Sequence, residues 1–139
     1  ADSHVIPGLI HKCWLACQNN TKFIVSGTGK PLRQFIYSHD LARCILLVLE
    51  SYESSEPIIL STDASDEVSI GSVAELIAKE CGYIGEIEYD TSKSDGQYKK
   101  TASNQLFRTL YPEFEFTNIS TGIAQTVQWF KLNYPNVRR

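Results

Sequence analysis

The segment 23–40 constrains the fold of this chain more than any other part of it. Two strand-like stretches, 22–25 and 33–37, flank a tight turn at 27–31 that contains two glycines and a proline. Arg33 follows directly after this turn. Because a planar guanidinium can donate to two oxygens at once, an arginine held beside a turn is suited to bind an anionic group. The segment therefore predicts an anion-binding corner.

The same turn is not a dinucleotide-binding loop. Its sequence, Gly27-Thr28-Gly29, lacks the third glycine of the dinucleotide fingerprint and joins two strands instead of a strand and a helix. The chain therefore predicts one half of a ligand site, with the other half on sequence outside it.

Composition and charge exclude several classes of protein. The chain has 139 residues, of which 42% are hydrophobic and 21% charged, and this is sufficient for one globular domain with its own core. Its net charge of -3 gives no broad positive field, which argues against nucleic acid or an anionic membrane as the main partner. No apolar run approaches the ~20 residues that span a bilayer.

The four cysteines contain no C-x-x-C pair and lie in helical patterns beside apolar residues. They are typical of free thiols in a reducing compartment, so we expect a cytoplasmic protein. No spacing of histidines predicts a metal site.

Hydrophobic periodicity and turn signals predict a mixed α/β domain of about five helices and four short strands. The predicted helices cover residues 6–18, 38–49, 69–81, 103–110 and 119–134, and the predicted strands cover 22–25, 33–37, 57–60 and 86–89. Ser38 is expected to cap the second helix, which is apolar almost all round and is expected to be deeply buried. The continuous apolar run 57–60 predicts a strand covered on both faces.

Several polar side chains are candidates for chemistry. Arg33, Lys12 and a lysine group at 93, 99 and 100 lie on three segments and can converge on a diphosphate, although each lysine can equally be a solvated surface charge. His4 precedes the first helix and can serve as a general acid or be an exposed terminal residue. Asp95 can accept hydrogen bonds from sugar hydroxyls or simply form a turn with Gly96.

Three blocks of sequence, 4–12, 27–38 and 91–101, together resemble the GDP-L-fucose synthase family, in that family's order and spacing. These enzymes are GDP-4-keto-6-deoxy-D-mannose 3,5-epimerase/4-reductases of the extended short-chain dehydrogenase/reductase superfamily. The resemblance implies that residues 1–139 form a single C-terminal nucleotide-sugar-binding domain, a fragment of a longer parent. It also implies that the NADP-binding Rossmann domain, with a catalytic serine, a Tyr-x-x-x-Lys pair and an epimerisation cysteine, is absent.

The resemblance further implies roles for individual residues. His4 matches the family histidine that acts as acid in epimerisation and lies near the nicotinamide, so it is both catalytic and cofactor-contacting. The substrate-contacting positions of the family fall on Lys12, Ser26, Arg33, Asp95 and Lys100. Ser26 stands where family members carry a tryptophan, so the packing that this tryptophan supplies is changed here.

The resemblance implies that NADP(H) binds mainly to the absent domain, through which the parent also forms a homodimer, and that this chain alone reduces nothing. Two alternatives stay open. The chain can belong to another nucleotide-sugar epimerase or dehydratase of the superfamily, or it can be a non-catalytic interaction domain.

Overall fold

A computed structural model describes residues 4–137 of the chain and has the mixed α/β architecture that the sequence predicts. The α-helices are α1 (Val5–Asn19), α2 (Ser38–Ser51), α3 (Ile70–Cys81), α4 (Gln105–Leu110) and α5 (Ile119–Asn133), and a 3-10 turn covers Ala64–Asp66. The strands are β1 (Phe23–Ser26), β2 (Leu32–Arg33), β3 (Val68–Ser69), β4 (Ile87–Asp90) and β5 (Lys99–Lys100). Among the described residues, no helix is long and apolar enough to cross a bilayer.

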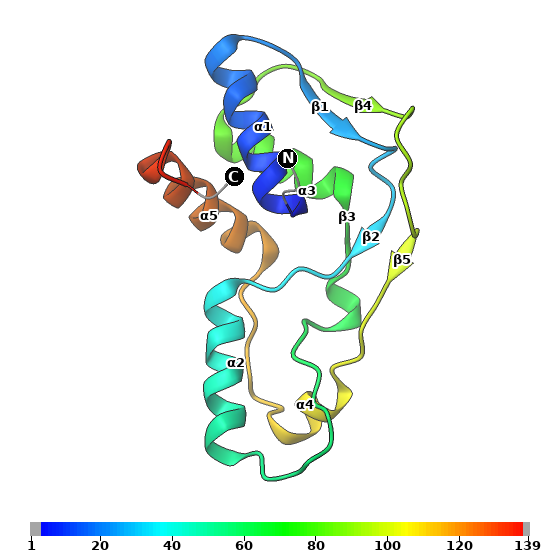
Figure 1. Cartoon of the computed structure of the whole chain (residues 1–139), viewed down its shortest axis with the longest axis vertical. Helices are drawn as coiled ribbons and strands as arrows, with labels where there is room; N and C mark the ends of the chain where they lie inside the picture. Colours follow the sequence, from blue (N-terminus) through cyan, green and yellow to red (C-terminus); the bar gives the residue numbers. More distant parts are fainter. Residues whose placement is uncertain (1–3, 138–139) are drawn as a thin grey trace.

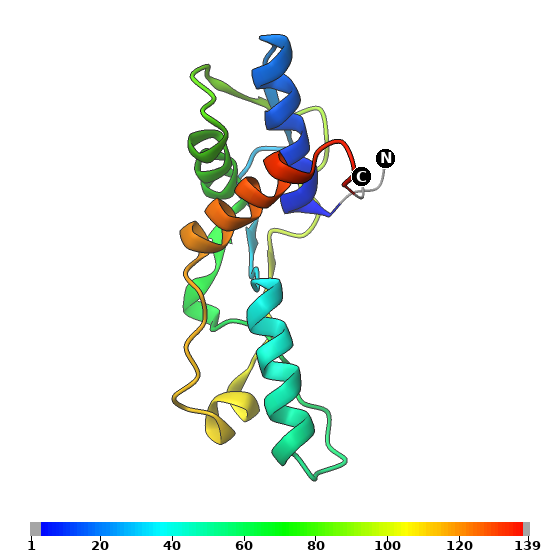
Figure 2. The same ribbon diagram turned by 90° about the vertical axis from the view of Figure 1, so that its left-hand side faces the viewer.

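The molecule is elongated and has two parts (Figures 1 and 2). The upper part contains α1, α3 and α5 with β1 and β4, and it holds the main core, where α3 packs against both α1 and α5. The lower part contains α2, α4 and their connecting segments around a small core of Cys44, Phe107 and Phe114. The short strands β2, β3 and β5 lie between the two parts.

Helix α3 forms where the sequence predicts it because its local signals agree. The Ser69 hydroxyl accepts from the Ser72 N–H at 3.0 Å, which satisfies one of the N–H groups left open at the start of a helix. Gly82 ends the helix in the left-handed region, with φ 79°. Between these ends Val73 and Ile77 are fully buried in the main core.

The strands form two small sheets. Strand β1 pairs in parallel with β4, and β2 lies between β3, which is antiparallel to it, and β5, which is parallel. The predicted strand over 33–37 is wrong beyond Arg33. The side-chain amide of Gln34 accepts from the Ala102 N–H at 2.7 Å and donates to the Thr62 carbonyl at 2.8 Å. These side-chain hydrogen bonds replace the backbone hydrogen bonds that a longer strand would make there.

Two other predictions are wrong in the lower part. Residues 57–60 pair with no strand among the described residues; Ile58 and Leu60 pack on the small core while Ile59 is 49% exposed. Helix α2 is not deeply buried, because Leu46 and Leu49 are 59% and 76% exposed. Several large apolar side chains of the lower part are therefore exposed.

The N-terminus of α2 ties the two parts together. Ser38 does not cap this helix; Tyr37 is the cap residue and makes no capping bond through its side chain. Instead the Asp40 carboxylate, 2% exposed, accepts from the Thr117 N–H at 2.6 Å and pairs with Arg43. Because a buried carboxylate is stable only when paired, this contact fixes α2 to the segment that leads into α5.

Candidate functional site

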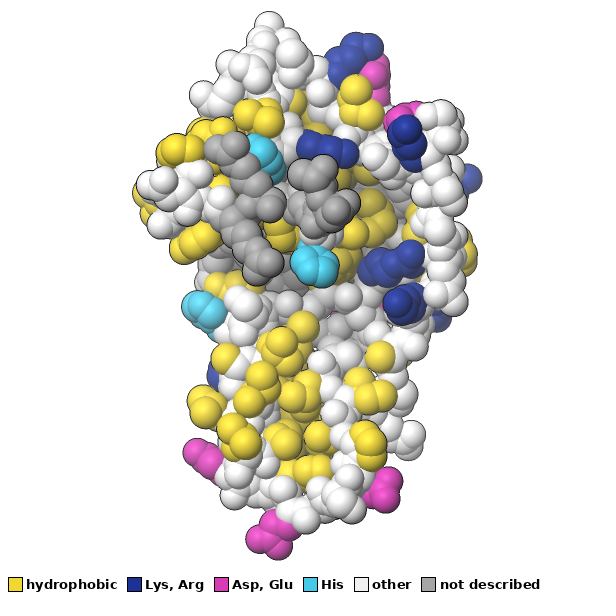
Figure 3. All heavy atoms as spheres, in the orientation of Figure 1, with side chains coloured by type: hydrophobic (Ala, Val, Ile, Leu, Met, Phe, Trp, Pro, Cys, Tyr) yellow, Lys and Arg dark blue, Asp and Glu magenta, His cyan; other side chains and the backbone are white. Residues whose placement is uncertain are grey.

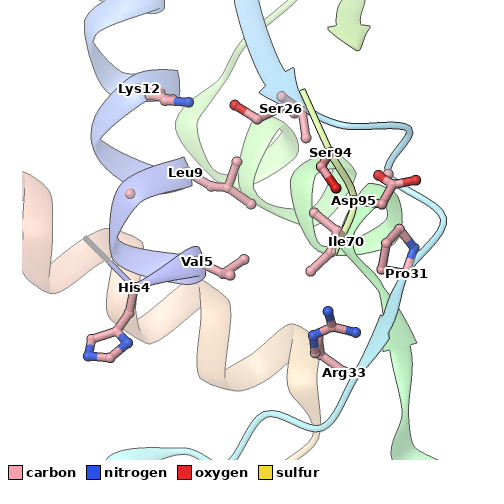
Figure 4. A pocket seen from close by; sticks show the side chains of 13 residues that line it. His4, Val5, Leu9, Lys12, Ser26, Pro31, Arg33, Ile70, Ser94 and Asp95 are labelled. Carbon is pink, nitrogen blue, oxygen red and sulfur yellow. The ribbon is translucent and has the colours of Figure 1, made fainter. Parts of the chain in front are cut away.

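A pocket of about 320 Å³ lies between α1, the end of β1, the turn 27–31 and the loop before β5 (Figure 4). Five of the six residues predicted to form a ligand site line it: His4, Lys12, Ser26, Arg33 and Asp95. The structure therefore brings together side chains from three segments within residues 4–33 and from the distant loop that carries Asp95.

The turn that shapes this pocket needs its glycines. Gly27 and Gly29 have φ of 84° and 73°, in the left-handed region that other residues rarely adopt. A Cβ on Gly29 would lie 2.4 Å from the Cε1 atom of Tyr89. The Gly29 carbonyl accepts from the Gly71 N–H at 2.8 Å, which fixes the turn against the start of α3.

Asp95 holds the loop before β5 against this turn. Its carboxylate accepts from the backbone N–H of Thr28 at 2.6 Å and from the Thr28 hydroxyl at 2.6 Å. These bonds, the hydroxyl one first, keep the pKa of Asp95 below its ordinary value. Asp95 is therefore more than a turn residue before Gly96, and both of its oxygens already have partners on Thr28.

This pairing predicts a pH-dependent contact. The folded-state pKa of Asp95 is lowered, so the contact is complete above the ordinary aspartate pKa of about 3.9 and is lost as the pH falls through the lower folded value. We expect the NMR shift of the Thr28 amide to titrate with a midpoint below ~3.9. Asp95→Asn should abolish that titration, whereas Asp90→Asn should preserve it. A midpoint at or above the ordinary value would contradict the contact.

Arg33 is held at the pocket by backbone carbonyls. Its Nη1 donates to the Leu32 carbonyl at 2.7 Å, and its Nη2 donates to the Gln97 carbonyl at 2.7 Å. A weaker contact joins Nη1 to the Tyr98 carbonyl at 3.4 Å. A guanidinium has five N–H groups, so these bonds orient it and leave the Nε hydrogen and one Nη2 hydrogen for a ligand.

Lys12 lies in α1 and His4 is the residue that directly precedes this helix, so the two lie about two turns apart. Figure 4 shows the Lys12 side chain pointing from α1 toward Ser26 at the end of β1. Ser26 is exposed and has a small side chain, so the space beside it is open to a ligand. His4 lies at the N-terminal end of α1, on the rim of the pocket.

Charge and apolar surface together define what the pocket can bind. Lys12 and Arg33 are its cations, and the carboxylate of Asp95 is already engaged with Thr28. The apolar part of the lining comes from Val5, Leu9, Val25, Pro31 and Ile70. The volume falls at the small end of the range for small-molecule pockets, about 300–1,000 Å³. The pocket therefore suits a ligand that has a phosphate group and an apolar face. Its volume is sufficient to enclose part of such a ligand.

The three lysines of the predicted cluster do not line the pocket. Lys99 forms an ion pair with Glu67 at 3.1 Å. Lys100 is exposed and lies beside Arg33 in the β2–β5 pairing. Its role as a substrate contact stays a prediction, and so do the roles of the five residues that line the pocket.

Several residues that the structure places at or beside the pocket were not predicted from the sequence. Thr28 and Ser94 carried no separate signal, although the Asp95-Gly96 turn marks where the partner loop bends. Tyr89 also carried no signal; with Lys93, one of the three lysines of the predicted cluster, it has the Tyr-x-x-x-Lys spacing. Tyr89 lies in β4 and packs under Gly29 and Gly71, and burial raises the pKa of its hydroxyl, so its position is structural.

No group of three or more His, Cys, Asp or Glu side chains within residues 4–137 is arranged to hold a metal ion. The other histidine of α1, His11, contacts the rings of Phe130 and Tyr134 in the main core. Its place is therefore in packing and not in the pocket.

Comparison with known proteins gives consistent matches. Residues 1–61 match the NAD dependent epimerase/dehydratase family. The chain is 51% identical to a GDP-L-fucose synthase of Dictyostelium discoideum over 138 residues, which are 99% of this chain and 43% of that protein. It is 47% identical to a probable GDP-L-fucose synthase of Drosophila melanogaster, covering 99% of this chain and 45% of that protein.

A solved structure is similar to the same extent. The crystal structure of a GDP-L-fucose synthetase from Naegleria fowleri bound to NADP matches with a TM-score of 0.97 and 52% sequence identity, covering 99% of this chain and 43% of that one. The chain thus spans less than half the length of the relatives that it matches. The matches include almost all residues of this chain.

Proposed function

We propose, because this chain is homologous over almost its whole length to GDP-L-fucose synthases, that it is the nucleotide-sugar-binding part of such an enzyme. The whole enzyme would convert GDP-4-keto-6-deoxy-D-mannose to GDP-L-fucose by 3,5-epimerisation and NADPH-dependent reduction of the 4-ketone. The observation that carries this proposal is the pocket, which is lined by His4, Lys12 and Arg33 together with an apolar floor. The apolar floor consists of Val5, Leu9, Val25, Pro31 and Ile70.

The chemistry assigns a task to each of these residues. Arg33 and Lys12 bind the diphosphate, and the apolar floor contacts the less polar face of the ligand. A ketone at sugar C4 acidifies the protons on C3 and C5, and each inversion needs a base on one face of the ring and an acid on the other. His4, at the rim, supplies the acid, while the base lies outside this chain.

The described residues do not fit NADP(H) by themselves. Their Gly-x-Gly turn joins two strands, and its Gly29 is occupied by packing on Tyr89, so it offers no helix N-terminus to a pyrophosphate. NADP(H) would therefore bind mainly to the part of the parent outside this chain, with His4 reaching toward it. This chain alone would reduce nothing.

The role of His4 can be tested in the full-length parent protein. Incubation with GDP-4-keto-6-deoxy-D-mannose and NADPH should yield GDP-L-fucose. His4→Asn should slow formation of the 3,5-inverted sugar by about 10²- to 10⁴-fold, the usual contribution of a general acid, because the base alone exchanges the C3 and C5 protons without inverting these centres. His39→Asn is the matched control, because His39 is exposed and lies outside the pocket.

The outcomes of this test separate the proposal from its alternatives. A parent that binds the GDP-sugar but yields a different product would be another epimerase or dehydratase of the superfamily. If the parent binds no GDP-sugar, this chain would be a non-catalytic interaction domain of it. A normal rate of inversion at C3 and C5 in His4→Asn would remove His4 from the mechanism.

The surface of the lower part supports the proposal that this chain is one domain of a larger protein. Hydrophobic side chains gather over the lower part in the space-filling view (Figure 3). The exposed large apolar residues of α2, α4 and the segment 57–60, here called the lower surface, are Ile45, Leu46, Leu49, Ile59, Leu106 and Leu110. We propose that the remainder of the parent covers this surface.

The lower surface predicts self-association of the isolated chain. Exposed apolar patches drive association, so the chain should form oligomers that sedimentation velocity detects. Leu46→Lys combined with Leu49→Lys should shift it toward monomer, whereas Leu132→Lys should not, since Leu132 is 78% exposed on α5, away from this surface. A strictly monomeric unsubstituted chain would instead indicate a self-contained fold.

We also propose a cytoplasmic location, which the four free cysteines favour. The parent is proposed to form a homodimer through the region outside this chain. The net charge of -3 favours a small anionic ligand held by a few cations over nucleic acid or a membrane surface.

A further inference from the structure

The segment 95–102 is bonded at its first residue to the turn that precedes Arg33. There the Asp95 carboxylate accepts from the Thr28 hydroxyl, and this hydroxyl in turn accepts from the Lys30 N–H at 3.3 Å. A Cβ on Gly27 would clash with a carboxylate oxygen of Asp95, so the glycine leaves the space that this carboxylate occupies. The Thr28 hydroxyl therefore fixes the beginning of the segment in a site shaped to receive it.

The same segment is bonded at its last residue to the side chain of Gln34. The Gln34 amide pairs with the Ala102 backbone as a peptide group would: its Oε1 accepts from the N–H at 2.7 Å, and its Nε2 donates to the carbonyl at 3.2 Å. Its Nε2 also donates to the Thr62 carbonyl at 2.8 Å. Because a side-chain amide has only two N–H donors, the bonding of Gln34 is complete and its position is fixed.

Arg33 is bonded to the middle of this segment. Its Nη2 donates to the Gln97 carbonyl at 2.7 Å, and its Nη1 contacts the Tyr98 carbonyl at 3.4 Å. The Tyr98 carbonyl also accepts from the Leu32 N–H at 2.8 Å. The direction of the guanidinium therefore depends on where the segment 95–102 places two carbonyl oxygens.

We propose that Thr28 and Gln34 are positioning residues for ligand binding, because they hold the segment 95–102 at both ends and this segment directs the Arg33 guanidinium into the pocket. Neither of the two residues lines the pocket itself. The inference rests on the proposed function, in which Arg33 binds the diphosphate. A donor that is already oriented loses little freedom when the ligand binds, so the loss of either end contact lowers affinity without removing a ligand contact.

A third contact limits the size of the effect. The Glu67 carboxylate accepts from the Thr101 hydroxyl and forms an ion pair with Lys99 at 3.1 Å. The segment 95–102 therefore keeps one side-chain contact when an end contact is lost. We expect each single variant to loosen Arg33 and not to release it.

The action of the two residues on Arg33 can be measured without a ligand, by NMR of the 139-residue chain with isotope-labelled arginine. A guanidinium held by carbonyls rotates slowly, so its Nη hydrogens give separate signals, and Arg33→Lys identifies those of Arg33. Thr28→Val and Gln34→Met should each speed this rotation, whereas Thr28→Ser, which keeps the hydroxyl, should not. Arg43 and Arg108 are internal references, because each is paired with a carboxylate elsewhere in the molecule.

Circular dichroism checks that each variant is folded. If Gln34→Met is not, Gln34→Glu takes its place, because it keeps the acceptor for the Ala102 N–H and loses both donors. If Thr28→Val is not folded, Thr28→Ala repeats the test.

The consequence for binding is measured by calorimetry of the full-length parent with GDP. Thr28→Val and Gln34→Met should each lower the affinity by about 2- to 10-fold, the range for a neutral hydrogen bond. In the Arg33→Ala background the same changes should alter it by less than about 2-fold, because their effect passes through Arg33. Thr109→Val and Gln105→Met, both in α4, are the matched controls and should bind GDP as the wild type does.

Two results would overturn the proposal. The first is an Arg33 rotation that stays slow in both Thr28→Val and Gln34→Met. The second is a loss of GDP affinity that is as large in the Arg33→Ala background as in the wild type, since the two residues would then act by another route. A wild-type parent that binds no GDP, with Arg33 responding as expected, would contradict the proposed function and still support the positioning of Arg33.

Discussion

Replacing Arg33 with alanine is expected to lower the affinity of the full-length parent for GDP by about 10- to 100-fold. Hydrogen bonds to charged groups contribute roughly 1.5–3 kcal/mol each, and 1.4 kcal/mol corresponds to a factor of ten. The Leu32 and Gln97 carbonyls orient the guanidinium before the ligand arrives, so little freedom is lost on binding. Isothermal titration calorimetry with GDP measures the change.

Two further variants separate charge from geometry at this position. Arg33→Lys keeps the charge but loses the planar fork, so its affinity should fall between those of the wild type and Arg33→Ala. Lys93→Ala removes a cation from the neighbouring loop that does not line the pocket, and it should bind GDP normally. Unchanged GDP affinity in Arg33→Ala, with a normal melting temperature, would exclude Arg33 as the diphosphate clamp.

Replacing Gly29 with alanine is expected to destabilise the chain by about 2–5 kcal/mol. The left-handed backbone costs an alanine roughly 1–2 kcal/mol, and forcing an extra carbon into packed space costs roughly 1–3 kcal/mol more. The extra carbon would lie 2.4 Å from the Tyr89 ring, so either the turn or β4 must move. Because the turn forms a wall of the pocket, ligand affinity should fall together with stability.

Gly82→Ala is the matched control for this effect. Gly82 has a similar φ of 79°, but nothing lies within 4 Å of a Cβ placed there. It should therefore cost only about 1–2 kcal/mol, the backbone contribution alone. Chemical denaturation of the three proteins measures the difference. Equal losses in the two variants would mean that the Tyr89 contact adds nothing.

Elements with strong local signals were predicted well, and elements that depend on distant partners were not. Helix α3 begins after Ser69 and ends before Gly82, as predicted, because the capping serine and the terminating glycine are local signals at the ends of the helix. The predicted strand over 33–37 shortened to two residues because the Gln34 side chain bonds to the distant Ala102. Residues 57–60 have the composition of a buried strand, yet no described strand pairs with them.

The candidate site shows the same division. Five of the six predicted residues lie in the three blocks of sequence and Ser26 directly precedes the second block; all but Lys100 line one pocket. The contact between Asp95 and Thr28 was not predicted, because the two residues are separated by 67 positions and neither has a pattern that refers to the other. The apolar floor was also missed, since Leu9 and Ile70 are indistinguishable in sequence from other core residues.

The sequence by itself determined the fold class, most helix boundaries and the need for glycine in the turn before Arg33, because periodicity, capping and backbone sterics are local properties. Only the tertiary structure decided that this turn closes a pocket with α1 and that Asp95 fastens it. It also decided which apolar faces stay exposed. These outcomes depend on how packing orients elements that are far apart in the chain, and no local pattern encodes that orientation.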